Sequence, residues 1–128
     1  MSVGLGDVHV TLDTSPPLLA QLLDVLVDNA FAYSQPGTSV IVRATADADR
    51  VTIDVQDHGI GISDADRPRI FEPFFRAADA RRVRAAGSGL GLAIVARLAT
   101  ALAATVHCDS APGKGSTFSV SLPRRRTT

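Results

Sequence analysis

The stretch Gly87-Ser88-Gly89-Leu90-Gly91-Leu92-Ala93-Ile94-Val95 joins a glycine-rich loop to an apolar pattern of helical spacing. The free N–H groups at a helix start, together with the helix dipole, favour an anion there, and glycines let the backbone come close to a phosphate. The spacing matches neither a P-loop nor a Rossmann turn. The stretch alone leaves two interpretations open, a phosphate-binding loop or a plain loop before a helix. The predicted apolar face of the helix contains Leu90, Ala93, Ile94, Arg97, Leu98 and Ala101.

Length and composition indicate one globular domain over residues 1–128. Thirteen basic and thirteen acidic side chains give a net charge of zero, which argues against nucleic-acid binding. Cys108 is the single cysteine, so an internal disulfide is excluded and a reducing compartment is expected. The sequence shows no apolar run of roughly 20 residues and no signal peptide. We expect a cytoplasmic domain without direct membrane insertion, with any membrane tether in another part of the protein or in a partner.

Hydrophobic periodicity predicts both helices and strands along the chain. Apolar residues at helical spacing predict a helix from Pro16 to about Ser34, with Ser15 as its N-cap. The predicted buried stripe of this helix consists of Leu19, Leu22, Leu23, Leu26, Ala30 and Tyr33. Period-two alternation predicts strands at 8–12, 40–42, 51–55, 105–108 and 116–122, with turns at 47–49 and 112–115.

Two polar residues stand where they could meet a ligand. Asn29 lies on or beside the apolar stripe of the first helix, where an amide without partners is unfavourable. It is either a core amide bonded to backbone or an oxygen ligand for a cation or polar group. Asp57 follows a strand and precedes Gly59 and Gly61, which places its carboxylate to accept hydrogen bonds from a ligand in a cleft. His58 has no nucleophile or carboxylate partner at a suitable spacing, so we expect a loop residue.

Two further segments precede the glycine-rich loop. Residues 69–76 hold three of the five phenylalanines, interrupted by Pro73, and predict a compact plug against the domain. Residues 77–86 are rich in arginine but have almost no apolar stripe. They form either a solvated helix or a mobile lid that closes on phosphates.

Five short blocks, taken together, make the chain resemble the catalytic ATP-binding domain (HATPase_c, Bergerat fold) of bacterial two-component sensor histidine kinases. That family belongs to a larger group with the gyrase, Hsp90 and MutL ATPases. The resemblance spans about Val8 to Leu122 and implies a two-layer α/β sandwich, with a mixed sheet of about five strands covered on one face by about three helices. The blocks are 26–30 with Tyr33 (N box), 57–61 (first glycine box), 70–76 (F box), 87–92 (second glycine box) and 113–118 (last glycine box).

The resemblance implies a site for ATP and Mg²⁺. Asp57 would accept a hydrogen bond from the adenine amine, and Asn29 would hold Mg²⁺ through its amide oxygen. Tyr33 would flank the nucleotide, and Arg76 would reach a phosphate or the partner domain. No residue is assigned as catalytic. The implied ATP-binding residues are Asn29, Tyr33, Asp57, Gly59, Gly61, Arg76, Gly87, Ser88, Gly89, Leu90, Gly91, Leu92, Ser116 and Thr117.

The implied reaction is transfer of the γ-phosphoryl group of ATP to a histidine on a dimerisation and phosphoacceptor domain, with a response regulator downstream. None of His9, His58 and His107 stands in the helical hairpin that such a histidine requires, so a partner in the same or another chain would supply it. The chain is either a piece of a longer kinase or one half of a naturally split one.

Three positions depart from the family pattern and keep other functions open. Val25 replaces an asparagine, Ala32 a basic residue and Ser15 an aspartate. Val25 and Ala32 favour a nucleotide-binding interaction module without transfer activity. An anti-sigma-type serine kinase is a second alternative, against which the complete F box argues. A gyrase-like ATPase is a third, but Val25 stands where those relatives have a glutamate that acts as general base.

Overall fold

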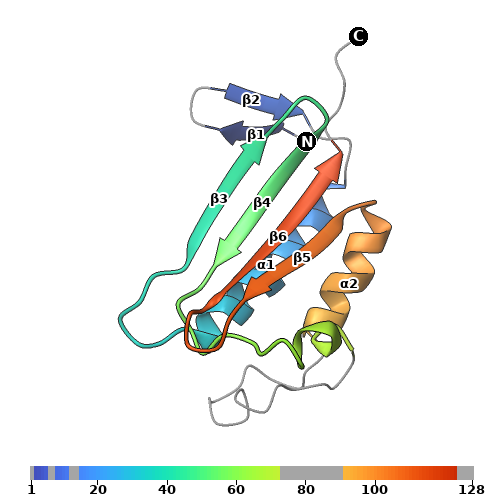
Figure 1. Cartoon of the computed structure of the whole chain (residues 1–128). Coiled ribbons are helices and arrows are strands. Elements are labelled where there is room, and N and C mark those ends of the chain that lie inside the picture. Colours follow the sequence, from blue (N-terminus) through green and yellow to red (C-terminus); the bar gives the residue numbers. More distant parts are fainter. Residues whose placement is uncertain (1, 6–7, 12–14, 73–90, 124–128) are drawn as a thin grey trace.

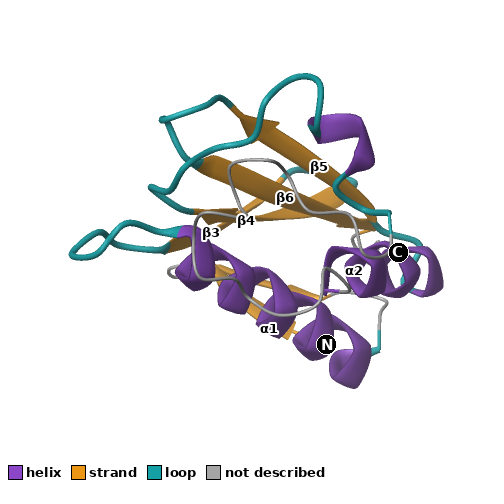
Figure 2. Ribbon diagram, turned by 90° about the horizontal axis from the view of Figure 1, so that it is seen from below, coloured by secondary structure: helices purple, strands orange, loops and turns teal. Residues whose placement is uncertain are grey.

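The computed structural model describes residues 2–5, 8–11, 15–72 and 91–123. Its main sheet has four antiparallel strands in the order β3-β4-β6-β5, and two helices cover one face (Figure 1, Figure 2). The described part is therefore a two-layer α/β sandwich, as the sequence predicts. The elements of these two layers are α1 (Pro16–Tyr33), β3 (Ile41–Ala46), β4 (Arg50–Gln56), α2 (Gly91–Ala101), β5 (Thr105–Ser110) and β6 (Ser116–Pro123).

The first helix, α1, buries most of the stripe that its sequence predicts, although Leu23 and Tyr33 are only half-buried. It begins at Pro16, in the first turn, where proline's missing N–H leaves no intrahelical bond unmade. Ser15 occupies the N-cap position with an extended backbone but makes no side-chain capping bond. The helix ends where Ser34 donates both its N–H and its hydroxyl to one carbonyl, that of Ala30. The buried residues of α1 are Leu19, Leu22, Leu26 and Ala30.

The second helix, α2, buries only part of the predicted stripe: Ala93 is buried and Leu98 is half-buried. Ile94 is 39% exposed, and Arg97 and Ala101 are also exposed, so these three assignments to the buried face are wrong. Most positions of α2 are apolar, and such a sequence offers more than one stripe at helical spacing. Packing against both α1 and β5 selects the stripe that includes Val95, Ala99 and, just beyond the helix, Leu102. In the described ranges, neither helix has the length and apolar character that a membrane span requires.

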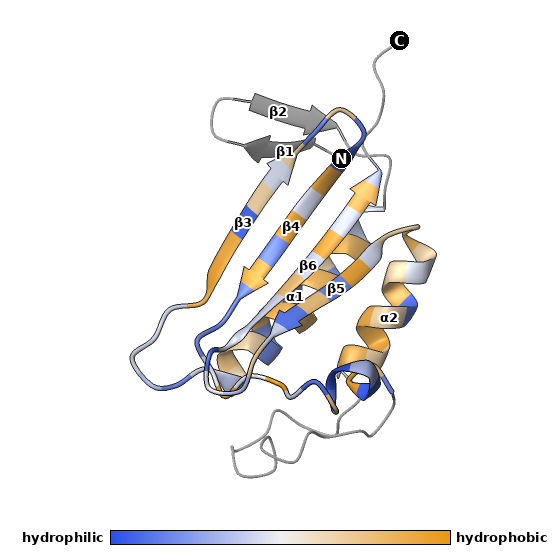
Figure 3. Cartoon of the chain, in the orientation of Figure 1, coloured by the Kyte–Doolittle hydropathy of each residue, from blue (hydrophilic) through white to orange (hydrophobic). Residues whose placement is uncertain are grey.

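The sheet confirms the predicted hairpin and the predicted C-terminal strands. Along β4 and β6 every second residue is buried, and the hydropathy alternates accordingly (Figure 3). Phe71, just after the short 3-10 helix η1 (Arg67–Arg69), packs edge-to-face on Phe118, with ring centroids 6.3 Å apart. The core between sheet and helices is thus closed at one end by an aromatic pair. The core residues facing each other across these two strands are Val51 with Leu122, Ile53 with Val120, and Val55 with Phe118.

The predicted N-terminal strand forms, but it does not join the main sheet. It runs over β2 (Val8–Thr11) and pairs with β1 (Ser2–Leu5) in a separate antiparallel sheet of two strands (Figure 1). Only two residues separate the strands, a spacing that favours a hairpin between sequence neighbours. The expected mixed sheet of about five strands is therefore not confirmed, since the described main sheet is antiparallel with four strands. Two α-helices rather than about three are found among the described residues.

Candidate nucleotide site at the ends of β4 and β6

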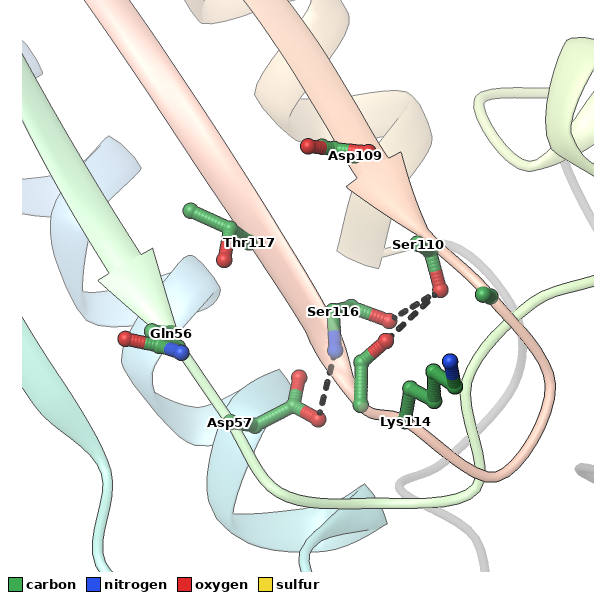
Figure 4. Close-up of a pocket in the computed structure, with 9 residues that line it drawn as sticks. Gln56, Asp57, Asp109, Ser110, Lys114, Ser116 and Thr117 are labelled. Atoms are coloured by element: carbon green, nitrogen blue, oxygen red, sulfur yellow. Dashed lines mark hydrogen bonds between the residues drawn. The ribbon is translucent and has the colours of Figure 1, made fainter.

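Asp57 is a buried carboxylate at the end of β4. Because side chains alternate along a strand, Asp57 lies on the same face as the core residue Val55, and it is 3% exposed. Its Oδ1 accepts a hydrogen bond from the N–H of Gly59 at 2.9 Å. It accepts a second one from the N–H of Ser116 at 3.2 Å (Figure 4). Its Oδ2 accepts none from any described residue. One carboxylate oxygen is therefore fixed by the backbone, and the other has hydrogen-bonding capacity to spare.

Burial controls the protonation of this group. It raises the pKa of the Asp57 carboxyl above its ordinary value, because the charged form loses hydration. The N–H groups of Gly59 and Ser116 and the charge of nearby His58 oppose that rise and offset only part of it. The hydrogen bonds to Oδ1 thus help to keep a buried acceptor ionised.

Two glycines beside Asp57 allow main-chain segments to approach one another closely. A side chain at Gly59 would overlap the carbonyl group of Tyr33, with which α1 ends, and an isolated β-bridge joins Ser34 to Gly59. Gly61 has φ +74°, and a side chain there would overlap the carbonyl group of Ala111. The segment 57–61 is therefore held between the end of α1 and the β5–β6 turn, and it requires glycine at both positions.

Asn29 and Tyr33 lie one turn apart on α1, near this segment. Both side chains are half-buried. Within the described part of the chain, the Asn29 amide makes no hydrogen bond, which does not support its interpretation as a core amide bonded to backbone. Residues four apart share a helix face, so Asn29 and Tyr33 lie on one side of α1. Asn29 is thereby available as an oxygen ligand.

The start of α2 lies against α1. A side chain built on Gly91 would come 3.4 Å from Cγ1 of Val25, a normal packing distance. Val25 is one turn before Asn29, so the first residues of α2, Gly91 and Leu92, lie beside the helix that carries the candidate metal ligand. The other predicted site residues of this region, Arg76, Gly87, Ser88, Gly89 and Leu90, lie outside the described residues, as does the predicted lid at 77–86.

Ser116 and Thr117, both predicted to bind ATP, face opposite sides of the sheet. Ser116 is buried beside Asp57, whereas Thr117 is only half-buried and pairs in register with Gln56 and Asp109, on the face that the helices do not cover. All five residues line a hollow of about 220 Å³ at the strand ends (Figure 4). Asn29 and Tyr33 do not line it. The structure thus brings Ser116, but not the Thr117 side chain, to the same face as the Asp57 carboxylate.

Ser110 is a residue that the sequence reasoning missed. It is the last residue of β5, and its buried hydroxyl contacts Ser116 Oγ at 2.8 Å. Arg67 donates to its carbonyl at 3.3 Å and forms a 2.7 Å ion pair with Asp64. Alternation along β5 from the buried Cys108 would have placed Ser110 inside, but serine in a strand gives no other signal. In the described part of the chain, no cluster of three or more His, Cys, Asp or Glu residues could hold a metal ion.

Comparison with known proteins identifies related sequences over most of the chain. The family model described as "Histidine kinase-, DNA gyrase B-, and HSP90-like ATPase" matches residues 14–126. The sensor-like histidine kinase SenX3 of Mycobacterium tuberculosis is 45% identical over 106 residues, which are 83% of this chain and 26% of SenX3. The sensor histidine kinase RcsC of Escherichia coli is 36% identical over 117 residues, which are 91% of this chain and 12% of RcsC. The chain thus spans about a quarter or less of the length of these curated relatives.

Two solved structures share both sequence and fold with the chain. The mycobacterial sensor histidine kinase MprB superposes with a TM-score of 0.81 at 30% identity, covering 93% of this chain and 80% of that one. Full-length ShkA in complex with AMPPNP superposes with a TM-score of 0.71 at 34% identity, covering 87% of this chain and 22% of ShkA.

Proposed function

Because the chain belongs to the family of histidine kinase-, DNA gyrase B- and HSP90-like ATPases, we propose that it binds Mg-ATP and donates the γ-phosphoryl group to a histidine of a phosphoacceptor domain. The observation that carries this proposal is the buried Asp57, whose Oδ1 is held by two backbone N–H groups while Oδ2 stays unpaired among the described residues. An acceptor of this kind suits a base that presents an amine. We also propose that the domain acts in the cytoplasm, as the sequence leads us to expect.

Asp57 would select adenine by its hydrogen-bonding character. The exocyclic amine of adenine donates a hydrogen bond, whereas guanine presents a carbonyl oxygen at the equivalent position. An ionised carboxylate only accepts, so Asp57 pairs with the first and repels the second. A buried acceptor left without a partner is unfavourable, which makes the discrimination larger than at an exposed site.

Asn29 offers an amide oxygen that could hold a magnesium ion. Its amide makes no hydrogen bond in the described part of the chain, and Mg²⁺ commonly takes one or two protein oxygens and completes its shell with waters and phosphates. Bound there, Mg²⁺ would neutralise charge on the triphosphate. The start of α2 at Gly91 and Leu92, with residues 87–90 before it, would offer backbone N–H groups to the phosphates.

The phosphoacceptor histidine and the response regulator belong to this proposal as partners. The relatives SenX3 and RcsC are sensor histidine kinases, which supports a histidine as the acceptor. A second candidate function is nucleotide binding without transfer. Val25 favours it, because an apolar side chain stands beside Gly91 at the start of α2, where the family usually has an amide.

Transfer to an added acceptor separates these two functions. The chain is incubated with γ-labelled ATP, Mg²⁺ and a separately produced phosphoacceptor hairpin of SenX3. The proposal predicts acid-labile label on the hairpin, absent when the hairpin histidine is replaced by glutamine. ATP binding without any label transfer, to this hairpin or to that of MprB, would favour the binding module. Absence of ATP binding itself would refute the proposed function altogether.

A further inference from the structure

Ser110 joins the two loops that surround Asp57. Its Oγ lies 2.7 Å from the N–H nitrogen of Ile62. It also lies 2.9 Å from the carbonyl oxygen of Gly115 and 2.8 Å from Oγ of Ser116 (Figure 4). We propose that Ser110 is a positioning residue that fixes the orientation of the Asp57 carboxylate and thereby sets the preference of the site for adenine over guanine. This inference rests on the proposed nucleotide-binding function.

Only one arrangement of protons satisfies all three contacts of the Ser110 hydroxyl. The Gly115 carbonyl can only accept, so Ser110 donates its single proton there. The Ile62 N–H can only donate, so it takes one lone pair of Ser110. The contact with Ser116 must then use the second lone pair, with the Ser116 hydroxyl as donor. The hydroxyl of Ser110 is therefore fully occupied and acts on the nucleotide only through its neighbours.

The proton of Ser110 fixes the peptide group that holds Asp57. The Gly115 carbonyl and the Ser116 N–H belong to the same planar peptide group. Ser110 binds the carbonyl end at 2.9 Å, and Asp57 Oδ1 binds the N–H end at 3.2 Å. Gly115 has φ +79°, so the backbone on one side of this peptide group has the freedom of glycine. Without the Ser110 hydroxyl, the peptide group loses the bond that opposes its rotation.

Ser110 also acts on the second donor to Asp57. The Ile62 N–H that it accepts belongs to the loop that carries the Gly59 N–H, the other partner of Oδ1. Both donors are thus tied to one buried hydroxyl. When they are fixed, Oδ1 is saturated and Oδ2 is the oxygen left for a ligand. When they are loosened, the carboxyl group can turn, and no single acceptor faces the base.

The test compares nucleotide selectivity in Ser110→Ala with a matched control. Ser119 lies on the neighbouring strand β6 and is half-buried on the sheet face that the helices do not cover, so Ser119→Ala removes a serine hydroxyl from the sheet without touching Asp57. Calorimetric titration with non-hydrolysable ATP and GTP analogues gives the ratio of the two dissociation constants. We expect the preference for the adenine nucleotide to fall about fivefold or more in Ser110→Ala and to stay unchanged in Ser119→Ala. Ser110→Thr, which keeps the hydroxyl, should restore most of the preference.

An unchanged ratio in a folded Ser110→Ala protein would overturn the inference and leave the proposed function intact, because the wild-type chain would still bind ATP. If Ser110→Ala does not fold, Ser110→Cys replaces it under the same criteria, since a thiol is similar in shape but donates only weakly. If neither variant folds while Ser119→Ala does, Ser110 is required for folding and the selectivity role is refuted. Failure of the wild-type chain to bind either nucleotide would instead refute the proposed function.

Discussion

At the scale of single residues, the site depends on groups that the fold buries without pairing them fully. The Asp57 carboxylate has backbone donors on one oxygen only, and the Asn29 amide makes no hydrogen bond among the described residues. Both features disfavour the empty site, because polar groups near a core need partners. Binding of a nucleotide with its metal ion would supply those partners.

The role of Asn29 is tested through the magnesium dependence of binding. If its amide oxygen holds Mg²⁺, Asn29→Ala should remove most of the gain in ATP affinity that Mg²⁺ gives, with little effect on metal-free binding. Titrations with Mg²⁺ and with EDTA measure the two affinities. The control is Asp28→Ala, an exposed neighbour on the same helix turn, which should behave as wild type. Full magnesium enhancement in Asn29→Ala would show that the residue is not a ligand.

Cys108 provides a prediction on pH. Burial raises the pKa of its thiol from an ordinary 9.0 to about 11, with the charge of Arg67 opposing part of the rise. The folded state therefore keeps a proton that the unfolded state loses, so this contribution to stability is complete below pH 9 and is lost as pH rises through about 11. Iodoacetamide at pH 9 should modify the folded chain far more slowly than the chain in urea. Equal rates would mean that the thiol is exposed.

Sequence reasoning singled out candidate site residues only where the neighbouring sequence was informative. Asp57 was identifiable because two glycines follow it at the end of a strand, and Asn29 because it interrupts an apolar stripe. Ser110 was not, because its importance arises from three contacts with residues in other segments. Thr117 was included with Ser116, although neighbours on a strand face opposite sides.

At the scale of elements, α1 supplies Leu19, Leu22, Leu26 and Ala30 to the core, and its last residue, Tyr33, lies against Gly59. Leu22 is fully buried, whereas Phe31 on the same helix is 62% exposed. One helix therefore carries both a buried and an exposed large apolar side chain, which allows their contributions to the free energy of unfolding to be compared.

Replacement of Leu22 by alanine should destabilise the chain by about 2–5 kcal/mol, because it leaves a cavity between α1 and the sheet. Phe31→Ala should change the free energy of unfolding by less than about 0.5 kcal/mol. Urea denaturation followed by circular dichroism measures both variants. A loss in Phe31→Ala as large as that in Leu22→Ala would indicate that Phe31 is buried in solution, against the described packing.

Local pattern was sufficient to predict α1 and the β3–β4 hairpin, but it could not decide pairing or packing partners. The N-terminal strand was predicted, yet its partner is its neighbour β1 rather than the main sheet. The alternating pattern of β2 shows that it is a strand and says nothing of which edge it joins. Similarly, α2 is apolar on most sides, so only its contacts with α1 and β5 determine which residues are buried.

At the scale of the whole molecule, we expect the isolated chain to bind ATP but not to hydrolyse it. In gyrase-like relatives, a glutamate one turn before the magnesium asparagine activates water, and here that position is Val25. Valine cannot take a proton, so water is a poor nucleophile in this site. A phosphoacceptor histidine brings its own nucleophilic nitrogen and does not require that base.

Phosphate release by the isolated chain in the presence of Mg-ATP should therefore be negligible over hours. A coupled phosphate assay measures it, with Asn29→Ala as the background control. Steady turnover in the wild type that disappears in Asn29→Ala would identify an ATPase rather than a kinase.

The measurement that tests the proposed nucleotide site most directly is a calorimetric titration of Asp57→Asn with ATP and GTP analogues in the presence of Mg²⁺. Asparagine has nearly the same shape, and its carbonyl oxygen can still accept from Gly59 and Ser116, so its amide nitrogen takes the place of Oδ2. That position then donates instead of accepting, which repels the adenine amine and favours the guanine oxygen. We predict that ATP affinity falls at least about tenfold and that GTP affinity stays equal or rises. Unchanged ATP affinity in a folded Asp57→Asn protein would show that Asp57 does not recognise the base.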